Sequence, residues 1–170
     1  MTPALVNRCR VISLSEIIAN SPLANVIHEN KLILLSPDAG EEKKLHSAAK
    51  KLAKSDNVIE VISASKTRDT KSGEITSTHI HGEVAGKDFI ILDDICDGGR
   101  TFIELAKSLK EKKSGAVYLY VTHGIFSKGL DELKKYFHHV YCYHTMLDEN
   151  KIDHNFITIL PASHAIVGAN

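Results

Sequence analysis

Residues 89–101 read Phe-Ile-Ile-Leu-Asp-Asp-Ile-Cys-Asp-Gly-Gly-Arg-Thr: an apolar run, then acids, a glycine pair and a cation. The apolar run from Phe89 to Leu92 is typical of a strand that is buried on both faces. Directly after the glycine pair, apolar side chains recur at helical spacing, at Phe102, Leu105, Ala106 and Leu109. The stretch therefore predicts a buried strand, a tight turn and an amphipathic helix, in that order.

The alternation of strand and helix continues on both sides of this stretch. Apolar segments typical of strands lie at residues 31–36, 58–62, 116–121, around 140 and at 156–160. Helical patterns lie at residues 40–54, 102–109 and 128–136, and a capping box at Ser13 and Glu16 begins another helix. This order predicts an α/β fold, a parallel β-sheet flanked by helices on both faces. Such sheets bind ligands at the carboxyl ends of their strands, where residues 93–101 are expected.

Length and composition predict one domain over residues 1–170. The chain has 170 residues, of which 43% are hydrophobic and 25% are charged, as in ordinary globular proteins. Its 21 basic residues balance 21 acidic residues, so it lacks the positive field of a dedicated nucleic-acid-binding protein. No apolar run approaches the roughly 20 residues that span a bilayer, and the three cysteines are widely spaced. We expect a cytoplasmic protein with no nucleic-acid and no membrane partner.

The acids and glycines after Leu92 suit a phosphorylated sugar. The adjacent carboxylates of Asp93 and Asp94 are costly at the end of a buried strand unless hydroxyl groups or a cation such as Mg²⁺ satisfy them. The Gly98–Gly99 pair permits a tight turn whose N–H groups face a ligand, and the helix N-terminus beyond it favours phosphate. The alternative is an ordinary turn in which Asp94 or Asp97 only caps the helix.

A polar segment, residues 63–86, interrupts the alternation, with only a weak apolar pattern from Ile75 to Ile80. It includes Lys66 and Arg68. Because so long a polar stretch is unusual between a strand and a helix, we expect a flexible lid bordered by an irregular hairpin.

The histidines and Cys96 predict no further site. The pairs at residues 79–81 and 138–139 have no cysteine or second histidine at zinc spacing, so we expect no dedicated zinc site. His123 falls at a strand end near the presumed site, where a role in that site and an ordinary loop or core role are both open. Neighbouring carboxylates should raise the pKa of Cys96, which we interpret as a packing residue.

With these residues in place, the sequence resembles the ribose-phosphate loop of the type I phosphoribosyltransferase fold. The usual form is two apolar residues, Asp-Asp, two residues, and Asp-Thr-Gly-Gly-Thr. Five positions match it: Asp93, Asp94, Asp97, Gly99 and Thr101. Gly98 stands at the usual Thr, whose hydroxyl typically donates to the phosphate, and Arg100 stands at the usual second Gly and adds a cation.

Three further segments are similar to one branch of that fold, the ribose-phosphate pyrophosphokinases (PRPP synthetases). Residues 36–40, Ser-Pro-Asp-Ala-Gly, resemble a loop whose Asp helps to bind the catalytic Mg²⁺. Residues 66–68, Lys-Thr-Arg, resemble the Lys-Arg-Arg of the family's catalytic flexible loop. Residues 121–127, Val-Thr-His-Gly-Ile-Phe-Ser, are close to the family's Val-Thr-His-Gly-Leu-Phe-Ser. The resemblance extends from about residue 32 to residue 166.

The resemblance implies a reaction and a role for each of these residues. ATP would donate a diphosphoryl group to the 1-hydroxyl of ribose 5-phosphate, which yields PRPP. Asp93, Asp94 and residues 97–101 would bind the ribose phosphate. Lys66 and Arg68 would act in catalysis by stabilising the transferring group. Mg²⁺ would be held by Asp38, Asp93 and Asp94.

Family members usually contain two copies of the fold, and this sequence corresponds to the C-terminal half. The N-terminal half of the family supplies a catalytic His and much of the nucleotide pocket. Two other functions are therefore open: a phosphoribosyltransferase that consumes PRPP, and a non-catalytic ribose-phosphate-binding regulatory module. No insertion suggests the hydrophobic hood that binds a base in the former, and the retained Lys66, Arg68 and Asp38 disfavour the latter. The resemblance also implies a homo-oligomer.

Overall fold

The protein is described by a computed structural model that covers residues 13–38, 40, 42–53, 58–68 and 75–161. Its seven described strands are β1 (Ile33–Ser36), β2 (Val61–Arg68), β3 (Ile75–Ile80), β4 (Phe89–Cys96), β5 (Val117–Gly124), β6 (His139–Thr145) and β7 (Ile157–Ile159). They form one sheet in the order β3-β2-β1-β4-β5-β6-β7. All neighbours are parallel except β2 and β3, which form an antiparallel hairpin.

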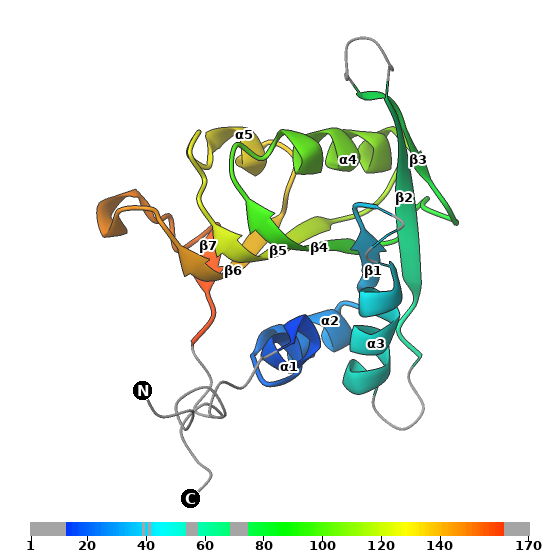
Figure 1. Cartoon of the computed structure of the whole chain (residues 1–170), viewed down its shortest axis with the longest axis horizontal. Helices are drawn as coiled ribbons and strands as arrows, with labels where there is room; N and C mark the ends of the chain where they lie inside the picture. Colours follow the sequence, from blue (N-terminus) through cyan, green and yellow to red (C-terminus); the bar gives the residue numbers. More distant parts are fainter. Residues whose placement is uncertain (1–12, 39, 41, 54–57, 69–74, 162–170) are drawn as a thin grey trace, which may run out of the picture.

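Helices cover both faces of this sheet (Figure 1). One face is covered by α1 (Leu14–Ala19), α2 (Leu23–Glu29) and α3 (Glu42–Leu52). The other face is covered by α4 (Arg100–Glu111) and α5 (Asp131–Lys134), and a short 3₁₀ turn at Glu149–Lys151 precedes β7. None of the described helices is long and apolar enough to cross a lipid bilayer.

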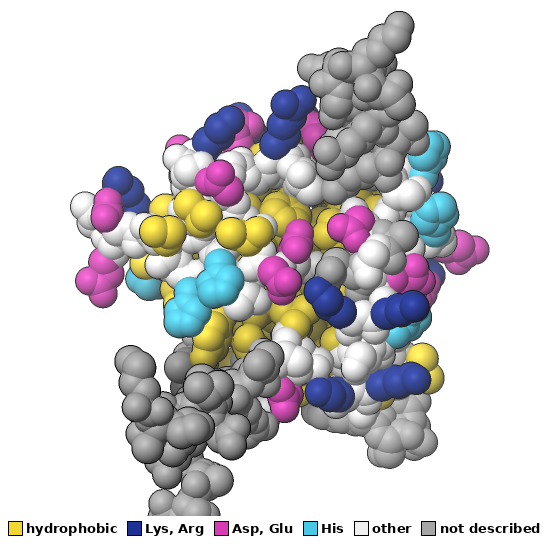
Figure 2. Space-filling view, viewed as in Figure 1, with side chains coloured by type: hydrophobic (Ala, Val, Ile, Leu, Met, Phe, Trp, Pro, Cys, Tyr) yellow, Lys and Arg dark blue, Asp and Glu magenta, His cyan; other side chains and the backbone are white. Residues whose placement is uncertain are grey.

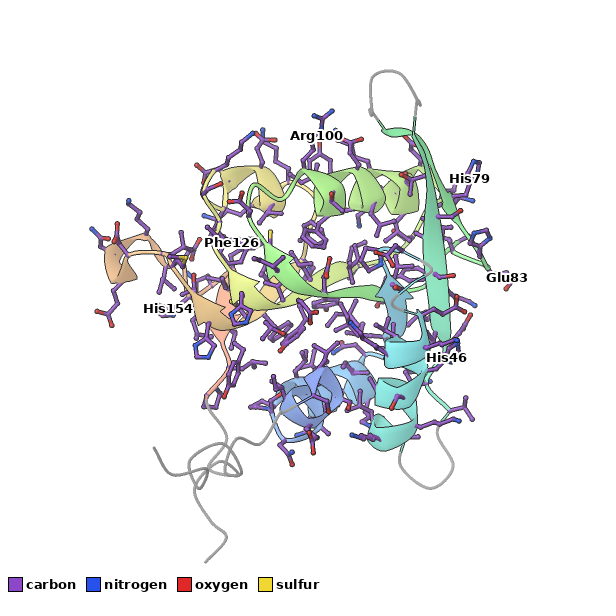
Figure 3. All side chains as sticks on the ribbon, in the orientation of Figure 1. His46, His79, Glu83, Arg100, Phe126 and His154 are labelled. Carbon is purple, nitrogen blue, oxygen red and sulfur yellow. The ribbon has the colours of Figure 1, made fainter. Side chains whose placement is uncertain are left out.

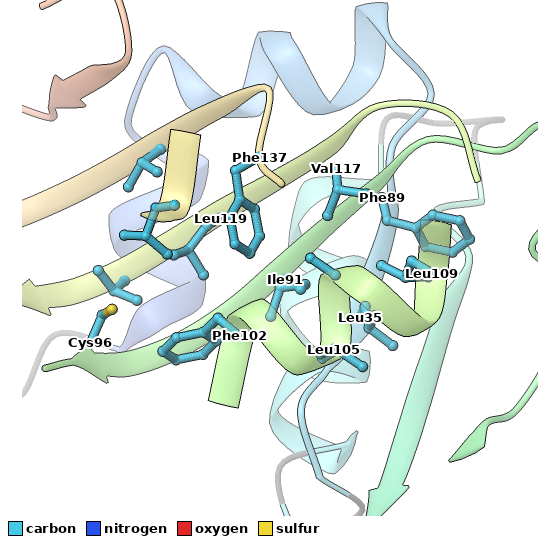
Figure 4. Packing of buried hydrophobic residues seen from close by; sticks show 14 of the residues in the cluster. Leu35, Phe89, Ile91, Cys96, Phe102, Leu105, Leu109, Val117, Leu119 and Phe137 are labelled. Atoms are coloured by element: carbon cyan, nitrogen blue, oxygen red, sulfur yellow. The ribbon is translucent and has the colours of Figure 1, made fainter. Parts of the chain in front are cut away.

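Strand β4 supplies both hydrophobic cores because its side chains alternate between the two faces. Phe89 and Ile91 pack in the cluster under α4 and α5, where Phe102 and Leu105 meet them (Figure 4). Ile90 and Leu92 pack in the second cluster, under α1 to α3. A strand with both faces buried must be apolar at every position, as the sequence of residues 89–92 is.

The strand order reverses between β1 and β4. From β1 the chain continues through α3 to β2 on one side, and from β4 it continues through α4 to β5 on the other. Because α3 and α4 lie on opposite faces, the loops after β1 and β4 diverge. Open α/β sheets typically have a ligand-binding crevice at such a point, at the carboxyl ends of the two strands. Asp38 follows β1, and the acids of residues 93–97 lie at the end of β4.

The predicted α/β architecture is confirmed, including the capping box at Ser13, whose hydroxyl accepts from the Glu16 N–H. Strand β4 is longer than the predicted apolar run and extends to Cys96. Its last residues pair in register with β5, Ile95 beside His123, so that strand pairing satisfies their backbone groups. Asp93 and Asp94 therefore belong to the strand itself.

Other predicted boundaries were wrong. The strand predicted at residues 58–62 begins at Val61, and Val58 is 94% exposed. It continues to Arg68 because β3 pairs with this polar segment, which confirms the hairpin, with a register shift between Thr67 and Arg68. The helix predicted at residues 128–136 is the short α5, and α2 was not anticipated.

Candidate functional site

A pocket of about 300 Å³ opens at the carboxyl end of β4. Its lining comes from the strand end, the turn and the first residues of α4: Asp93, Ile95, Asp97, Gly98, Gly99, Arg100, Thr101 and Phe102. Every residue predicted to bind the ribose phosphate lines this pocket except Asp94, which is exposed beside it. A larger pocket, of about 620 Å³, lies near the amino ends of β1 and β4, on residues such as Lys31 and Lys87, away from the predicted chemistry.

The turn into α4 requires glycine at only one of its two glycine positions. Gly99 has φ +75°, and a Cβ there would lie 3.1 Å from Leu133 Cδ2. Gly98 has no positive φ, and a Cβ there would make an ordinary 3.5 Å contact with the aliphatic chain of Lys128. The tight turn predicted for the Gly98–Gly99 pair thus depends on glycine at position 99 only.

The first turn of α4 has no side-chain cap. Gly99 is the N-cap residue, and its carbonyl accepts the first helical bond from the Ile103 N–H at 3.0 Å. Within the described chain, neither Asp94 nor Asp97 caps this helix, so the alternative interpretation of these acids as simple caps is wrong. The N–H groups of the first turn have no partner within the helix and carry the partial positive charge of the helix end.

Asp93 and Asp94 lie on opposite sides of the strand end. Adjacent strand residues point to opposite faces, and the Asp94 N–H donates to Asp93 Oδ1 at 2.7 Å. Burial, followed by the charges of Cys142, Asp93 and Asp97, raises the pKa of Cys96 to about 12, so Asp93 is on the α4 side with that thiol. The predicted increase in the pKa of Cys96 is confirmed, although burial contributes more to it than the carboxylates do.

On the other side of the strand, the charge of Asp94 contributes to a raised pKa of Tyr120. Burial raises the pKa of Tyr120 to about 12, its hydrogen bond with Thr122 lowers it, and the charges of Cys142 and Asp94 raise it further. Tyr120 packs in the cluster under α1 to α3. A sugar ring placed over the end of β4 would therefore have one carboxylate on each side.

Asp38 follows β1 at the same end of the sheet as the acids of β4. Strand β1 is parallel to β4 with Leu35 beside Ile91, so the residues that follow both strands emerge together. The Ser36 hydroxyl donates to the Asp38 carbonyl at 2.6 Å, which fixes the start of this loop. Carboxylates from both strands thus border the crevice, and acidic side chains lie near the middle of the face shown in Figure 2.

These carboxylates fit Mg²⁺ as donors but do not form a closed cage. Among the described residues, no three His, Cys, Asp or Glu side chains are placed to hold one ion together. Mg²⁺ prefers oxygen ligands, retains several waters and is commonly held by one or two carboxylates together with phosphate oxygens of a substrate. The donor set of Asp38, Asp93 and Asp94 is compatible with that kind of binding.

The loop after β5 supports the pocket and contributes a cation that sequence reasoning missed. The N–H groups of Ile125 and Phe126 donate to the Cys96 carbonyl at 2.8 and 3.2 Å, which ties this loop to the end of β4. Lys128 follows, and its aliphatic chain lies over Gly98. No sequence signal links residues 98 and 128, because their contact depends on the pairing of β4 with β5.

The other predicted cationic residues, Arg100, Lys66 and Arg68, have a less direct relation to the pocket after β4. Arg100 lines the pocket, but its side chain points away from the sheet (Figure 3). Lys66 and Arg68 lie on β2 and not in a loop, and β2 pairs with β1 so that Ser63 lies beside Ser36. Residues 66–68 therefore extend beyond the carboxyl end of β1. Their side chains, and residues 69–74 of the polar segment in which a lid was expected, lie outside the described residues.

Comparison with known proteins gives the family. Residues 25–136 match the model of the phosphoribosyl synthetase-associated domain. The chain belongs to this family. A ribose-phosphate pyrophosphokinase of Hyphomonas neptunium is 33% identical to the domain over 143 residues, 84% of this chain and 40% of that protein. Another from Maricaulis maris is 37% identical over 99 residues, 58% of this chain and 30% of that protein. The chain thus spans 40% or less of the length of these relatives.

Solved structures confirm the fold of this phosphoribosyl synthetase-associated domain. The phosphoribosylpyrophosphate synthetase of Mycobacterium smegmatis superposes with a TM-score of 0.66 and 24% identity, over 83% of this chain and 45% of that one. A purine phosphoribosyltransferase of Pyrococcus horikoshii superposes with a TM-score of 0.52 and 16% identity, over 94% and 90% of the two chains. The chain is a PRPP synthetase-like domain with the type I phosphoribosyltransferase fold.

Proposed function

We propose that the domain binds ribose 5-phosphate in the pocket after β4 and takes part in diphosphoryl transfer from ATP to the sugar 1-hydroxyl, which forms PRPP. The observation that supports this most is the pocket itself, which joins an uncapped helix N-terminus to the acids at the end of one strand. The first-turn N–H groups of α4 suit the 5-phosphate, and carboxylates on both sides of the strand suit the sugar hydroxyls.

In this proposal the phosphate-binding turn, residues 97–101, already has its bound conformation before the ligand binds. Gly99 holds the turn in the left-handed region, and the Cys96 carbonyl anchors the loop that carries Lys128. Such a preformed turn would hold the sugar by its 5-phosphate and leave its 1-hydroxyl near the crevice between β1 and β4. In this proposal, Lys128 adds positive charge beside the phosphate.

Asp38, Asp93 and Asp94 are the carboxylates available to Mg²⁺ at this end of the sheet. In this proposal one or two of them bind the ion, and water and phosphate oxygens of ATP supply its other ligands. When bound with ATP, Mg²⁺ neutralises charge on the phosphate oxygens. Lys66 and Arg68, on the segment of β2 that extends beyond β1, are proposed to bind the transferring group and to exclude water. Arginine suits this task because its planar guanidinium donates two parallel hydrogen bonds to a phosphate.

The complete reaction would need a second half-domain. We propose that this chain is equivalent to the C-terminal half of its longer relatives, and that it works in the cytoplasm as a homo-oligomer or with a separate partner. Sedimentation velocity measures the first of these arrangements directly, because self-association would appear as a species heavier than one 18.7 kDa chain.

One set of assays tests this proposal against its two alternatives. The purified chain is mixed with ribose 5-phosphate, ATP and Mg²⁺, and AMP and PRPP are measured. AMP formation that requires the sugar supports the proposal. Release of diphosphate from PRPP and a nucleobase, without AMP formation, would indicate a phosphoribosyltransferase. Calorimetric binding of ribose 5-phosphate without either turnover, in the chain alone and in the chain mixed with the N-terminal half of a longer relative, would indicate a regulatory module.

Two variants separate a catalytic lysine from a general loss of positive charge. Lys66→Ala should abolish sugar-dependent AMP formation while the affinity for ribose 5-phosphate stays within about twofold. Lys112→Ala removes an exposed lysine at the far end of α4 and should leave both unchanged. Equal activities for Lys66→Ala and Lys112→Ala would contradict the role of Lys66.

A further inference from the structure

Two histidines lie side by side at the carboxyl ends of β5 and β6. His123 and His144 are register partners on these parallel strands, and Ile95 of β4 is the partner of His123 on its other side. Register partners on neighbouring strands project from the same face of a sheet, so both imidazoles leave the sheet in the same direction. Their ring centroids are 5.8 Å apart, and the ring planes differ by 8°.

Both rings are available to a ligand. His123 and His144 are exposed, and within the described part of the chain neither ring forms a hydrogen bond. Several other histidines are engaged through a ring nitrogen: His28 with the Leu52 carbonyl, His81 with Ser65 and His139 with Thr158. His144 also packs edge-on against Tyr143 at 4.5 Å, which limits where its ring can turn.

The separation of the two rings suits one metal ion. An imidazole nitrogen bonds Zn²⁺ at about 2.1 Å, which puts the ring centroid about 3.2 Å from the ion and two tetrahedrally placed centroids about 5.2 Å apart. The observed 5.8 Å exceeds this by only a small amount. Because the rings are now parallel, at least one must turn about its Cβ–Cγ bond to aim its nitrogen at the ion, and its exposure allows that rotation.

We propose that His123 and His144 form a binding site for a divalent transition-metal ion such as Zn²⁺, Ni²⁺ or Cu²⁺. Imidazole nitrogen is a good ligand for these ions and a poor one for Mg²⁺, which takes oxygen. The site is therefore chemically distinct from the carboxylates of Asp38, Asp93 and Asp94. It does not depend on the proposed function.

The site is open. Among the described residues, no third His, Cys, Asp or Glu completes a ligand set, so water or the oxygens of a bound anion fill the other positions. With half the protein ligands of a structural zinc site, the dissociation constant should be roughly micromolar and not nanomolar. Ile95 both lines the pocket after β4 and neighbours His123, so the ion lies at the rim of that pocket.

Calorimetric titration of the full chain with ZnCl₂, without chelating buffer, tests the proposal. The wild type should bind one ion at this site, and His123→Ala and His144→Ala should each weaken that binding at least about tenfold. Two controls should leave it unchanged: His154→Ala, which removes an exposed histidine between β6 and β7, and Asp131→Asn, which removes an exposed carboxylate at the start of α5. Affinity that survives both histidine variants, or that falls equally in the controls, would overturn the assignment.

Electron paramagnetic resonance with one equivalent of Cu²⁺ provides an independent measurement. Coupling to two imidazole nitrogens is expected in the wild type, and coupling to one in either histidine variant. A spectrum that is the same in the wild type and both variants would place the ion elsewhere and contradict the site.

Discussion

Asp97 is exposed at the mouth of the pocket, two residues before the N-cap of α4. We predict that Asp97→Asn weakens ribose 5-phosphate binding at least about tenfold, or about 1.4 kcal/mol, because the amide loses the charge that accepts hydrogen bonds from sugar hydroxyls. Isothermal calorimetry measures this directly. Asp131→Asn, on the exposed side of α5, is the matched control, and an unchanged affinity in Asp97→Asn would remove that residue from the site.

Gly98 permits the opposite experiment, a gain of binding. The backbone there does not need glycine, and a new Cβ would meet only the flexible chain of Lys128 at 3.5 Å. Gly98→Thr should tighten ribose 5-phosphate binding about three- to tenfold, because its hydroxyl can donate to the phosphate, a charged acceptor. Gly98→Val has the same shape without the hydroxyl. If Val and Thr change the affinity equally, the phosphate does not lie against this position.

The residues of the candidate site differ in how far the sequence could predict them. The acids after β4 and Gly99 lie within seven positions of one another, so their spacing along a strand and turn was enough to predict one pocket. Lys128 and the freedom of Gly98 depend on the contact of two loops that are 30 positions apart in the chain. Local patterns carry no information on such contacts.

Between β5 and α5, glycines hold the loop that supports the pocket. A Cβ at Gly124 would lie 2.0 Å from Phe126 Cε2 and 2.8 Å from Cys142 Sγ, within a buried cluster. Gly124→Ala should therefore lower the free energy of unfolding by about 2–3 kcal/mol, near the upper end of what overpacking usually costs. Gly129 has φ +72° and open space around it, so Gly129→Ala should cost only about 1 kcal/mol through the backbone.

Urea denaturation measures both variants of this loop, and Gly98→Ala is the neutral reference. The predicted order of stability is Gly98→Ala, then Gly129→Ala, then Gly124→Ala. A Gly124→Ala variant as stable as Gly129→Ala would show that Phe126 does not fill the space beside β5.

Two buried thiols lie at the end of β4 and in the middle of β6. Burial raises the pKa of Cys96 to about 12 and that of Cys142 to about 11. Both thiols should stay protonated at pH 8, so iodoacetamide should modify neither in the native protein and both in urea, as read by mass spectrometry of the peptides. Rapid modification of Cys96 in the native protein would contradict the packing of this strand end.

The raised pKa values of Cys96 and Cys142 also predict how the free energy of unfolding changes with pH. Above about pH 9 the unfolded chain releases thiol protons that the native chain retains, so the unfolded state binds fewer protons and the free energy of unfolding falls as the pH rises. The decline should continue through about pH 11, where the native thiols begin to ionise. Urea titrations at pH 8 and pH 10 measure it, and stability that rises over this interval would contradict the shifts.

Element boundaries show where local patterns stopped being informative. The strand β2 extends to Arg68 because β3 supplies hydrogen-bond partners for a polar segment, and no local pattern records that pairing. The helix pattern of residues 128–136 could not be realised in full because Gly129 adopts a left-handed conformation before α5 begins at Asp131. By contrast, the apolar pattern alone was enough to predict the buried strand at residues 89–92 and the helix α4, because the positions that are buried are the apolar ones.

At the scale of the whole molecule, the order of the sheet brings the chemistry together. Strands β1 and β4 are neighbours although more than fifty residues separate them, and this pairing brings Asp38 to the edge that carries Asp93 and Asp94. Helices on opposite faces then hold the crevice open between them. The proposed sugar-phosphate site thus lies within this domain, whereas the proposed transfer also requires the half of the relatives that this chain does not span.

The crystal structure of the chain with ribose 5-phosphate tests this account most directly. The account predicts the 5-phosphate within about 3 Å of the backbone nitrogens at the start of α4, and the sugar hydroxyls against the carboxylates at the end of β4. A saturated crystal in which this turn remains empty, or in which the sugar phosphate occupies the larger pocket at the amino ends of β1 and β4, would contradict it.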